Sequence, residues 1–447
     1  MRLTTAGNAM MILEDARGVL LISDPWFADS GPAYFGSWTL SHEIPEDVMR
    51  SACSARFVWI SHGHPDHLHP SSISRLREKT FLVGSHVGSR LRDFLVSEGL
   101  RVVELPDRHW CWISDDVRIM CITTSYQDSV LLVAVGQSLL INLNDSGARH
   151  CAKFIRSIAE SFHSRYLLAL SGYGDADMIN IVNDLGQRIA PRQDRRVGDQ
   201  LTRIADLVGA THVIPFSSFH RYQRSDSVWA NEFTTPLGAY SEGVRADLSY
   251  LGPFVEVDLE DGAVTRLQPR ENNTSAIPAE VFGDDWDEKL SKPEARVVKE
   301  YFSRVERVTS SIGFIEVTVG GSTLRIEMDG KPTRGVRFEA PRRSLMDAVI
   351  YEVFDDLLIG NFMRTQLFGM HDLYQFEITP AVTKYADNGR AHSLDEVSTY
   401  LNEYKRRAGL EFVRQNLVEK FSRSVRYRLP QSGPIYRAGR RAYYNLR

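Results

Sequence analysis

Short apolar runs alternate with amphipathic segments through the first half of the chain, a pattern typical of strands and helices in turn. Strands are predicted at 8–15, 18–26, 55–62, 80–85, 117–125, 129–136, 138–145, 165–172 and 212–218. Helices are predicted at 69–79, 87–99, 148–163 and 197–210. Hairpins mixed with βα units in this order predict an α/β layered domain over residues 1–275, with its sheets covered by helices.

The pattern lapses in a polar stretch at 270–292, which we interpret as a domain boundary. Beyond it, three strands joined by glycine-containing turns are predicted at 313–321, 322–330 and 334–341. One long, well-buried helix is predicted at 344–363. These elements predict a smaller α+β accessory domain over 290–385. Residues 386–447 are predicted to form a charged helix, at about 394–408, and a basic tail.

The charge of the chain is close to balanced, with a formal net charge of −4 over 447 residues, which argues neither for nor against nucleic acid. No nucleic acid is expected as a partner. The end of the chain differs, because no acidic residue follows Glu419. Such a tail is a candidate contact for an anionic partner or a peripheral membrane surface, and the apolar helix is a candidate surface for a lipid, a partner or a homodimer. The arginines of the tail are Arg423, Arg426, Arg428, Arg437, Arg440, Arg441 and Arg447.

The cysteines and the N-terminus bear on the compartment. Cys53, Cys111, Cys121 and Cys151 show no paired spacing, which favours a reducing compartment without disulfides. Charged residues at 14, 15 and 17 interrupt the N-terminal apolar run, so no signal peptide is predicted. No apolar run approaches the roughly 20 residues that span a bilayer. We therefore expect a cytoplasmic protein.

Four histidines and one aspartate lie within the stretch SHGHPDHLHP, directly after a predicted buried strand. His62 and His64 alternate along the chain and can converge on one ion, while Asp66 and His67 can point toward a second. Imidazole with carboxylate suits zinc, iron or manganese, and thiolate ligands are lacking. His69 lies outside this spacing and is interpreted as a neighbouring or surface group. The stretch therefore predicts a metal site.

This stretch resembles the H-x-H-x-D-H motif of the metallo-β-lactamase fold superfamily. The resemblance implies an αββα sandwich and a centre that holds one or two divalent metal ions. It also implies an acidic residue at the end of the preceding strand, where LLISDPW has Asp24. Asp66 and Asp24 are the candidate catalytic residues, which would orient the nucleophile or a ligand imidazole.

The superfamily uses three further ligands: a third histidine, a bridging aspartate and a final histidine. Asp145, after the predicted strand 138–145, is the candidate bridging residue, although it could also cap the next helix. His220, at the end of HVIPFSSFH, is the candidate final histidine. Its competitor His212 opens that strand and would point away.

The third histidine has no counterpart in the expected region, CITTSYQDSVLLV. Asp128 is the candidate oxygen ligand there, or else a turn residue, and a first metal held only by His62, His64 and Asp145 would bind more weakly. The other candidate replacements are Thr124, Ser125, Tyr126 and Gln127, with His86 and His109 farther away in the chain.

Within the superfamily, several stretches resemble the metallo-β-lactamase-like region of CMP-N-acetylneuraminate hydroxylases. They are SHGHPDHLHP, QDSVLLVAVGQSLLINLNDS, HVIPFSSFHRYQRSDSVWANE and DLSYLGPFVEVDL, and together they cover much of residues 20–300. Those hydroxylases also carry a Rieske iron–sulfur domain, whose C-x-H and C-x-x-H pattern none of the cysteines here fits. The relatives have a histidine near the position of Thr124. The resemblance therefore implies a metal-centred enzyme acting on a polar small molecule. It does not imply a Rieske electron path, and the sialic-acid substrate is not carried over.

Two loops are candidates for binding the substrate, or else polar surface loops. The stretch SGYGDADMIN supplies Asp175 and Asp177, and HRYQRSDSVWANE supplies cationic and aromatic groups that suit an anionic or sugar-like molecule. In the second loop the candidate residues are Arg221, Tyr222, Arg224, Trp229 and Asn231.

Three functions follow as hypotheses. The first is a metal-dependent hydrolase that attacks a polar, sugar- or nucleotide-linked small molecule with a metal-activated water. The alternative is a dinuclear iron oxygenase or hydroxylase on the same fold, which fewer histidines and more oxygen ligands favour. The third is a non-catalytic metal-binding or ligand-binding protein, which the loss of one ligand suggests.

Overall fold

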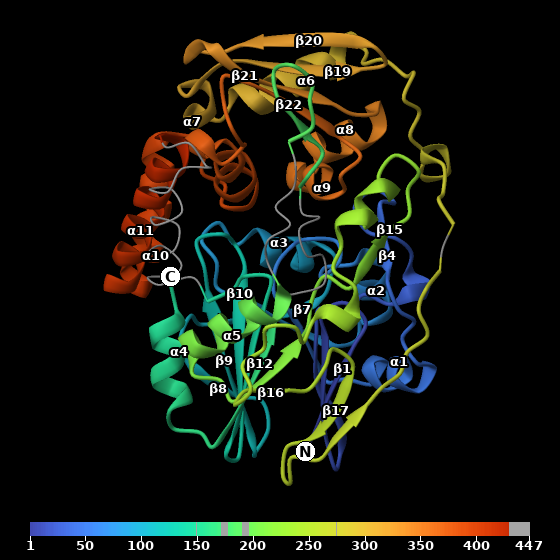
Figure 1. Cartoon of the computed structure of the whole chain (residues 1–447), viewed down its shortest axis with the longest axis vertical. Helices are drawn as coiled ribbons and strands as arrows, with labels where there is room; N and C mark the ends of the chain where they lie inside the picture. The colour runs from blue at the N-terminus through green and yellow to red at the C-terminus, as the bar shows by residue number, and fades with distance from the viewer. Residues whose placement is uncertain (149, 171–177, 190–195, 274, 429–447) are drawn as a thin grey trace.

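The computed structural model describes all residues except 149, 171–177, 190–195, 274 and 429–447 (Figure 1). Asp175, Asp177 and the arginines from Arg437 onward therefore lie outside the described residues. The chain forms two large sheets that lie below a smaller C-terminal domain in Figure 1. None of the described helices is both long and apolar enough to cross a membrane.

The first sheet has eight strands, and its parallel half carries the histidine motif. Strands β3, β5, β6 and β7 run parallel, while the strands on the other side of β3 pair antiparallel. In spatial order the strands are β18 (Val264–Arg266), β17 (Val255–Asp258), β1 (Arg2–Ala6), β2 (Met10–Asp15), β3 (Gly18–Ser23), β5 (Phe57–Ile60), β6 (Thr80–Gly84) and β7 (Arg101–Leu105).

The second sheet has seven strands and is also half parallel and half antiparallel. The first four strands run parallel and the last four pair antiparallel, with β11 shared between the two halves. Its order is β16 (Ser249–Tyr250), β14 (His212–Pro215), β12 (Ser164–Ala169), β11 (Ser138–Asn144), β10 (Ser129–Val135), β9 (Val117–Thr123) and β8 (Trp110–Trp112).

The apolar residues divide into three layers around these sheets. Leu21 of the first sheet and Leu131 and Leu168 of the second belong to one buried core between them. The outer face of the first sheet packs on α1 (Glu46–Cys53), α2 (Pro70–Arg75) and α3 (Arg90–Ser97). The outer face of the second packs on α4 (Ala152–Ala159) and α5 (Val197–Val208). The predicted αββα sandwich is confirmed.

The C-terminal domain is built on a third sheet of five strands. Its order is β13 (Ile181–Val182), β22 (Arg364–Phe368), β21 (Lys331–Glu339), β19 (Ile312–Val319) and β20 (Ser322–Glu327). Strand β13 comes from the chain of the sandwich and pairs parallel with β22, so the two domains share one sheet. The helices of this domain are α6 (Lys292–Ser303), α7 (Glu306–Thr309), α8 (Arg342–Ile350), α9 (Phe354–Ile359) and the π-helix η6 (Pro380–Asn388).

The prediction of one helix over 344–363 is wrong. The helix is broken at Glu352, which has a φ of 57°, and resumes as α9. The break is held by tertiary contacts, because the Glu352 carbonyl accepts a hydrogen bond from Arg90 Nη1 at 2.7 Å. At the other end of α9, Asn361 also has a positive φ, of 56°. A continuous apolar pattern contained no sign of either turn.

Helix α10 (Leu394–Ala408) returns to the sandwich and is followed by α11 (Leu410–Arg428). The Tyr404 hydroxyl lies 3.0 Å from His86 Nδ1, and the Tyr400 hydroxyl donates to the Ser125 carbonyl at 2.8 Å. The charged helix predicted at about 394–408 is therefore present, and it packs on the segment in which the third histidine was expected.

Candidate metal centre

The candidate ligands meet at the carboxyl edge of the two sheets, where parallel strands commonly place a site. Asp24 follows β3, the histidine motif follows β5, and Asp145 follows β11. His220 arrives differently from the prediction. Strand β14 ends at Pro215, and His220 begins a separate strand, β15 (His220–Tyr222), which pairs with β4 (Trp38–Leu40) outside the main sheets.

His67 is surrounded by carboxylates. Its Nε2 lies 3.3 Å from Asp66 Oδ2 and 3.5 Å from Asp145 Oδ2, yet makes no hydrogen bond with the described residues. Ligand atoms of His62, His67 and Asp145 all lie within 4.8 Å of one another. Burial would lower the pKa of His67, but the charges of Asp66, Asp145 and Asp24 raise it well above its ordinary value. The position is therefore one that strongly favours a positive charge.

His220 adds a neutral imidazole to this group. Its ring is buried and stacks on the Trp38 ring, with centroids 3.3 Å apart. Burial lowers the pKa of His220 to about 3, although the charge of Asp66 opposes this. Neither ring nitrogen has a hydrogen-bond partner among the described residues, and the same holds for Asp145 Oδ1.

We call His67, Asp66, Asp145 and His220 the His67 side of the centre. A buried polar atom without a partner costs about 1–3 kcal/mol, so several in one place call for an explanation. Neutral imidazole and carboxylate are the ligands of zinc, iron and manganese. The donor set and its unsatisfied atoms therefore fit a bound metal ion.

The remote nitrogen of each histidine in the motif is held by a different partner, as is usual for metal-binding histidines. His67 Nδ1 lies 3.0 Å from Asp24 Oδ2, and His62 Nδ1 lies 2.8 Å from the Ser61 hydroxyl. His64 Nε2 lies 3.1 Å from Asp355 Oδ2. These contacts leave His62 Nε2 and His64 Nδ1 facing each other at 2.9 Å.

The two predicted catalytic carboxylates face different nitrogens of His67: Asp24 lies beside Nδ1 and Asp66 beside Nε2. Asp24 is fully buried, and its Oδ1 accepts the Ser61 N–H at 2.8 Å. Asp24 is thus placed to orient the His67 imidazole. Asp66 is fixed by two neighbours, because its Oδ1 accepts from the Tyr34 hydroxyl at 2.5 Å and its Oδ2 from Asn8 Nδ2 at 2.9 Å.

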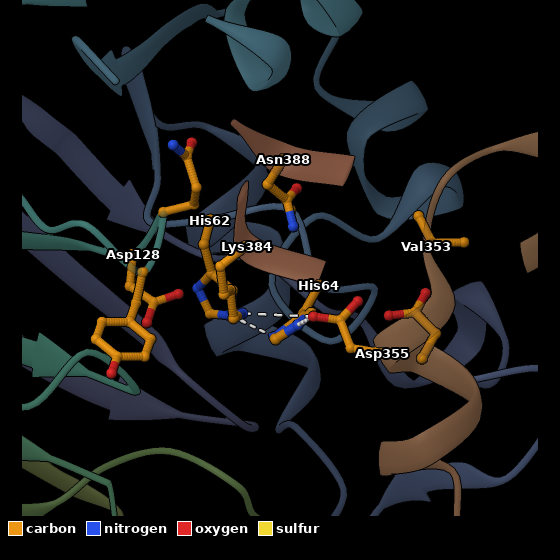
Figure 2. A pocket seen from close by; sticks show the side chains of 11 residues that line it. His62, His64, Asp128, Val353, Asp355, Lys384 and Asn388 are labelled. Carbon is orange, nitrogen blue, oxygen red and sulfur yellow. Dashed lines mark hydrogen bonds and ion pairs between the residues drawn. The ribbon is translucent and has the colours of Figure 1, made fainter. Parts of the chain in front are cut away.

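A small pocket opens beside His62 and His64 (Figure 2). In this pocket, Asp355 Oδ2 lies 3.1 Å from His64 Nε2 and 3.4 Å from the Lys384 ammonium nitrogen. Asp356 lies next to it, and burial together with the Asp355 charge raises the pKa of Asp356 well above its ordinary value. The full lining is His62, Gly63, His64, Tyr126, Gln127, Asp128, Val353, Asp355, Asp356, Lys384 and Asn388.

We call His64, Asp355, Asp356 and Lys384 the His64 side. Ligand atoms of His64, Asp355 and Asp356 also lie within 4.8 Å of one another. Sequence reasoning missed the last three residues, which come from α9 and η6 of the C-terminal domain. The available signal was a pair of adjacent aspartates within a stretch otherwise read as a buried apolar helix.

The segment that lacks the third histidine is fixed by α10. Gln127 Nε2 donates to the Tyr400 hydroxyl at 2.9 Å, and Thr124 is buried. Asp128 lines the pocket but belongs to neither of the two groups of three ligand atoms found among the described residues. Its role as a ligand stays a prediction.

The other histidines considered in the sequence analysis lie elsewhere. His86 Nε2 lies 2.8 Å from the Ser129 hydroxyl, and His109 Nδ1 lies 2.6 Å from the Asp107 carbonyl. His69 stacks on Trp26 with its Nε2 3.3 Å from the Pro32 carbonyl, and His212 stacks on Tyr166. Each of these contacts holds a part of the fold rather than the centre.

The predicted substrate-binding residues make contacts within the protein. Arg221 pairs with Glu271 at 2.9 Å, and the Asn231 side chain bonds both backbone groups of Tyr222. The Tyr222 hydroxyl accepts from Asn361 at 2.8 Å, and Trp229 Nε1 donates to the Asp226 carbonyl. None of them lines the pocket beside His62, and Asp175 lies outside the described residues. Their role in substrate binding stays a prediction.

Comparison with known proteins supports the resemblance. No protein family model matches the chain. Cytidine monophosphate-N-acetylneuraminic acid hydroxylase of Danio rerio is 29% identical over 134 residues, which are 28% of this chain and 22% of that protein. The Xenopus laevis protein of the same name is 26% identical over 148 residues, 31% of this chain and 25% of that protein. The matched part thus spans about a quarter of these relatives, and the resemblance to them is confirmed.

Solved structures with a similar arrangement include metal enzymes of two kinds. One is Igni18, a metallo hydrolase from Ignicoccus hospitalis, with a TM-score of 0.39, 15% identity and coverage of 60% of this chain and 98% of that chain. Another is CmlA, a diiron beta-hydroxylase from Streptomyces venezuelae, with a TM-score of 0.36, 15% identity and coverage of 60% and 54%.

Proposed function

We propose that this chain is a metal-dependent hydrolase that acts on a polar, sugar- or nucleotide-linked small molecule. The observation that carries the proposal is the group of buried ligand atoms on the His67 side. His67 Nε2 lies between two carboxylates without a hydrogen bond, and Asp145 Oδ1 and both nitrogens of His220 have no hydrogen-bond partner among the described residues. A zinc, manganese or iron ion held there would lower the pKa of a water molecule toward neutrality and polarise a carbonyl or phosphoryl oxygen.

The residues of the chain would prepare this chemistry in two ways. Asp24 and Ser61 orient His67 and His62, and Tyr34 with Asn8 orients Asp66, so little reorganisation is needed when an ion binds. The apolar ring of Trp38 covers His220 and keeps bulk water from that face. Asp66 has both carboxylate oxygens engaged, so its role is to hold position rather than to accept a proton from substrate.

The pocket beside His62 and His64 is the proposed entry for substrate. Its lining consists mainly of charged and polar side chains, which suits a small polar molecule or one polar portion of a larger one. The similarity to hydroxylases of cytidine monophosphate-N-acetylneuraminic acid supports a sugar- or nucleotide-linked substrate.

The second candidate is an iron-dependent oxygenase. It is favoured by the similarity to the hydroxylases named above. It is also favoured by the number of carboxylates among the candidate ligands, since oxygen ligands suit iron and manganese. In that case the residues described above would hold iron, and the pocket would admit both oxygen and substrate.

Metal analysis of the full chain, purified in parallel with and without oxygen, tests the proposal. Each preparation is assayed with a nitrophenyl ester, a lactone and bis(p-nitrophenyl) phosphate, and in an oxygen electrode with CMP-linked and free sugars. Zinc or manganese with turnover of a hydrolytic probe supports hydrolysis, and substrate-dependent oxygen uptake by the iron form supports the second candidate. Protein that contains no metal and takes up none after reconstitution would contradict both, as would unchanged activity in His67→Gln.

A further inference from the structure

The His64 side already contains a cation that the protein itself supplies. The Lys384 ammonium lies 3.4 Å from Asp355 Oδ2, the same oxygen that lies 3.1 Å from His64 Nε2. Figure 2 shows Lys384 beside His62 and His64, with Asp355 on the far side of His64. The Lys384 side chain is 17% exposed, so its charge is largely shielded from water.

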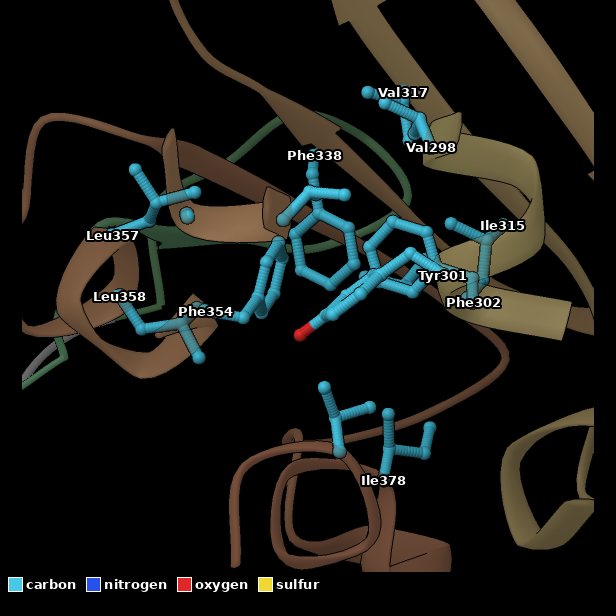
Figure 3. Close-up of a cluster of buried hydrophobic side chains, with 14 of the residues drawn as sticks. Val298, Tyr301, Phe302, Ile315, Val317, Phe338, Phe354, Leu357, Leu358 and Ile378 are labelled. Atoms are coloured by element: carbon cyan, nitrogen blue, oxygen red, sulfur yellow. The ribbon is translucent and has the colours of Figure 1, made fainter. Parts of the chain in front are cut away.

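The position of Lys384 is set by the helix that carries it and by the packing of that helix on the C-terminal domain. It lies on the π-helix η6, a rare conformation that is often found at functional sites. The neighbouring residue Asp387 accepts a hydrogen bond from the buried Tyr301 hydroxyl at 2.7 Å. Phe354 of α9 packs against Tyr301 and Phe338 in the core of the C-terminal domain (Figure 3).

Helix α9, which carries Asp355, is fixed to the sandwich at its far end. The Asn361 side chain accepts the Ile179 N–H at 2.8 Å and donates to the Tyr222 hydroxyl at 2.8 Å. The Ser37 hydroxyl donates to the Gly360 carbonyl at 2.6 Å. Asp355 and Lys384 are therefore placed against the histidine motif by packing at both ends.

The charges on this side come from three elements. Asp128 follows β9 and precedes β10, Asp355 and Asp356 lie on α9, and Lys384 lies on η6. A divalent ion placed between His62 and His64 would stand next to a fixed ammonium, and repulsion between like charges in a shielded site is strong. The segment near Thr124 also supplies no third imidazole for such an ion.

We propose that Lys384 stands in place of a second metal ion, so that the centre holds a single ion on the His67 side. That ion is bound by His62, His67 and Asp145, with Asp66 and His220 beside it. This inference rests on the proposed metal-dependent function. It also narrows that function, because a single ion supports hydrolysis by activated water and does not support chemistry that needs two irons.

Metal stoichiometry of the intact chain tests the inference without any activity measurement. Protein stripped with a chelator is titrated with Zn²⁺, desalted and analysed for zinc, and Co²⁺ absorption spectra report the ligand set. The wild type is expected to bind one equivalent. Lys384→Met is expected to bind two, because the Asp355 carboxylate loses its cation. Lys384→Arg keeps the charge and stays at one, as does Lys405→Met, which removes an exposed lysine of α10.

Two further variants locate the ion and keep the test decisive if Lys384→Met fails to fold. His67→Gln is expected to lower zinc affinity by more than about 100-fold, whereas His64→Gln changes it by less than about 3-fold. Two equivalents in the wild type, one equivalent in folded Lys384→Met, or loss of the ion in His64→Gln would each overturn the inference. Absence of any bound ion in the wild type would overturn the proposed function as well.

Discussion

The His67 side and the His64 side of the centre both combine histidine with aspartate, but their charged and polar groups have different partners. On the His67 side, His67, Asp145 and His220 present buried polar atoms that make no hydrogen bond with a described residue. On the His64 side, the Asp355 carboxylate contacts both the His64 ring and the ammonium of Lys384. The difference teaches that a cluster of histidine and aspartate indicates a cation without indicating its kind. A lysine from another domain can supply the charge that elsewhere requires a metal ion.

Removal of the metal ion is expected to have the largest effect, and on one side only. A ligand that binds the folded state at 100 times its dissociation constant adds about 2.7 kcal/mol to the free energy of unfolding. Chelator should therefore lower the melting temperature and raise amide exchange after β5, after β11 and at β15, while α9 keeps its protection. Hydrogen exchange with mass spectrometry measures this, and equal deprotection of α9 would contradict the comparison.

Two matched variants compare the carboxylates that contact His67 and His64. Asp24→Asn removes the partner of His67, and Asp355→Asn removes the partner of His64. With a single ion on the His67 side, Asp24→Asn should lower zinc affinity about 10–100-fold, as loss of such partners usually does. Asp355→Asn should change it by less than about 3-fold. Competition with a chromophoric chelator measures both affinities, and similar losses in the two variants would show that His64 is also a ligand.

The contact between α10 and the sandwich at the buried His86 is expected to be sensitive to acid. His86 lies between Ser129 and Tyr404 of α10, and burial followed by the Arg407 charge lowers its pKa from 6.5 to about 3. Because the unfolded chain binds the proton more readily, the stability from neutral His86 is complete above pH 6.5 and declines as pH falls toward 3. Between pH 7 and pH 5.5 the expected loss is about 1 kcal/mol.

Chemical denaturation of wild type and His86→Gln at the two pH values measures this smallest effect. The wild type should lose more stability than the variant, since only the wild type has the buried imidazole. A pH dependence that is unchanged in His86→Gln would assign the acid sensitivity to other groups.

Much of the fold could be predicted from sequence because the sandwich is made of local patterns. Buried strands such as β10 and β11 are apolar along nearly their whole length, and the amphipathic helix α5 ends at Gly209, a residue type that commonly ends helices. The C-terminal domain was predicted less well. Tertiary contacts at Glu352 and Asn361 break an apolar stretch that reads as one helix.

The core of the centre was determined by the sequence alone. His62, His64, Asp66 and His67 lie within six residues after a buried strand, so the geometry of one short loop brings them together. Asp24 and Asp145 follow the ends of strands, which is also a local property. Residues so close in the chain need little from the rest of the fold to become neighbours.

The tertiary structure alone decided which distant residues contact this loop. His220 reaches it on a separate short strand, and Asp355 meets His64 across 291 positions of the chain. That contact depends on two backbone turns, on the anchoring of Asn361 in the sandwich and on the π-helix that carries Lys384. Such contacts come from the packing of whole domains, and packing energy is shared among many residues that no local pattern marks.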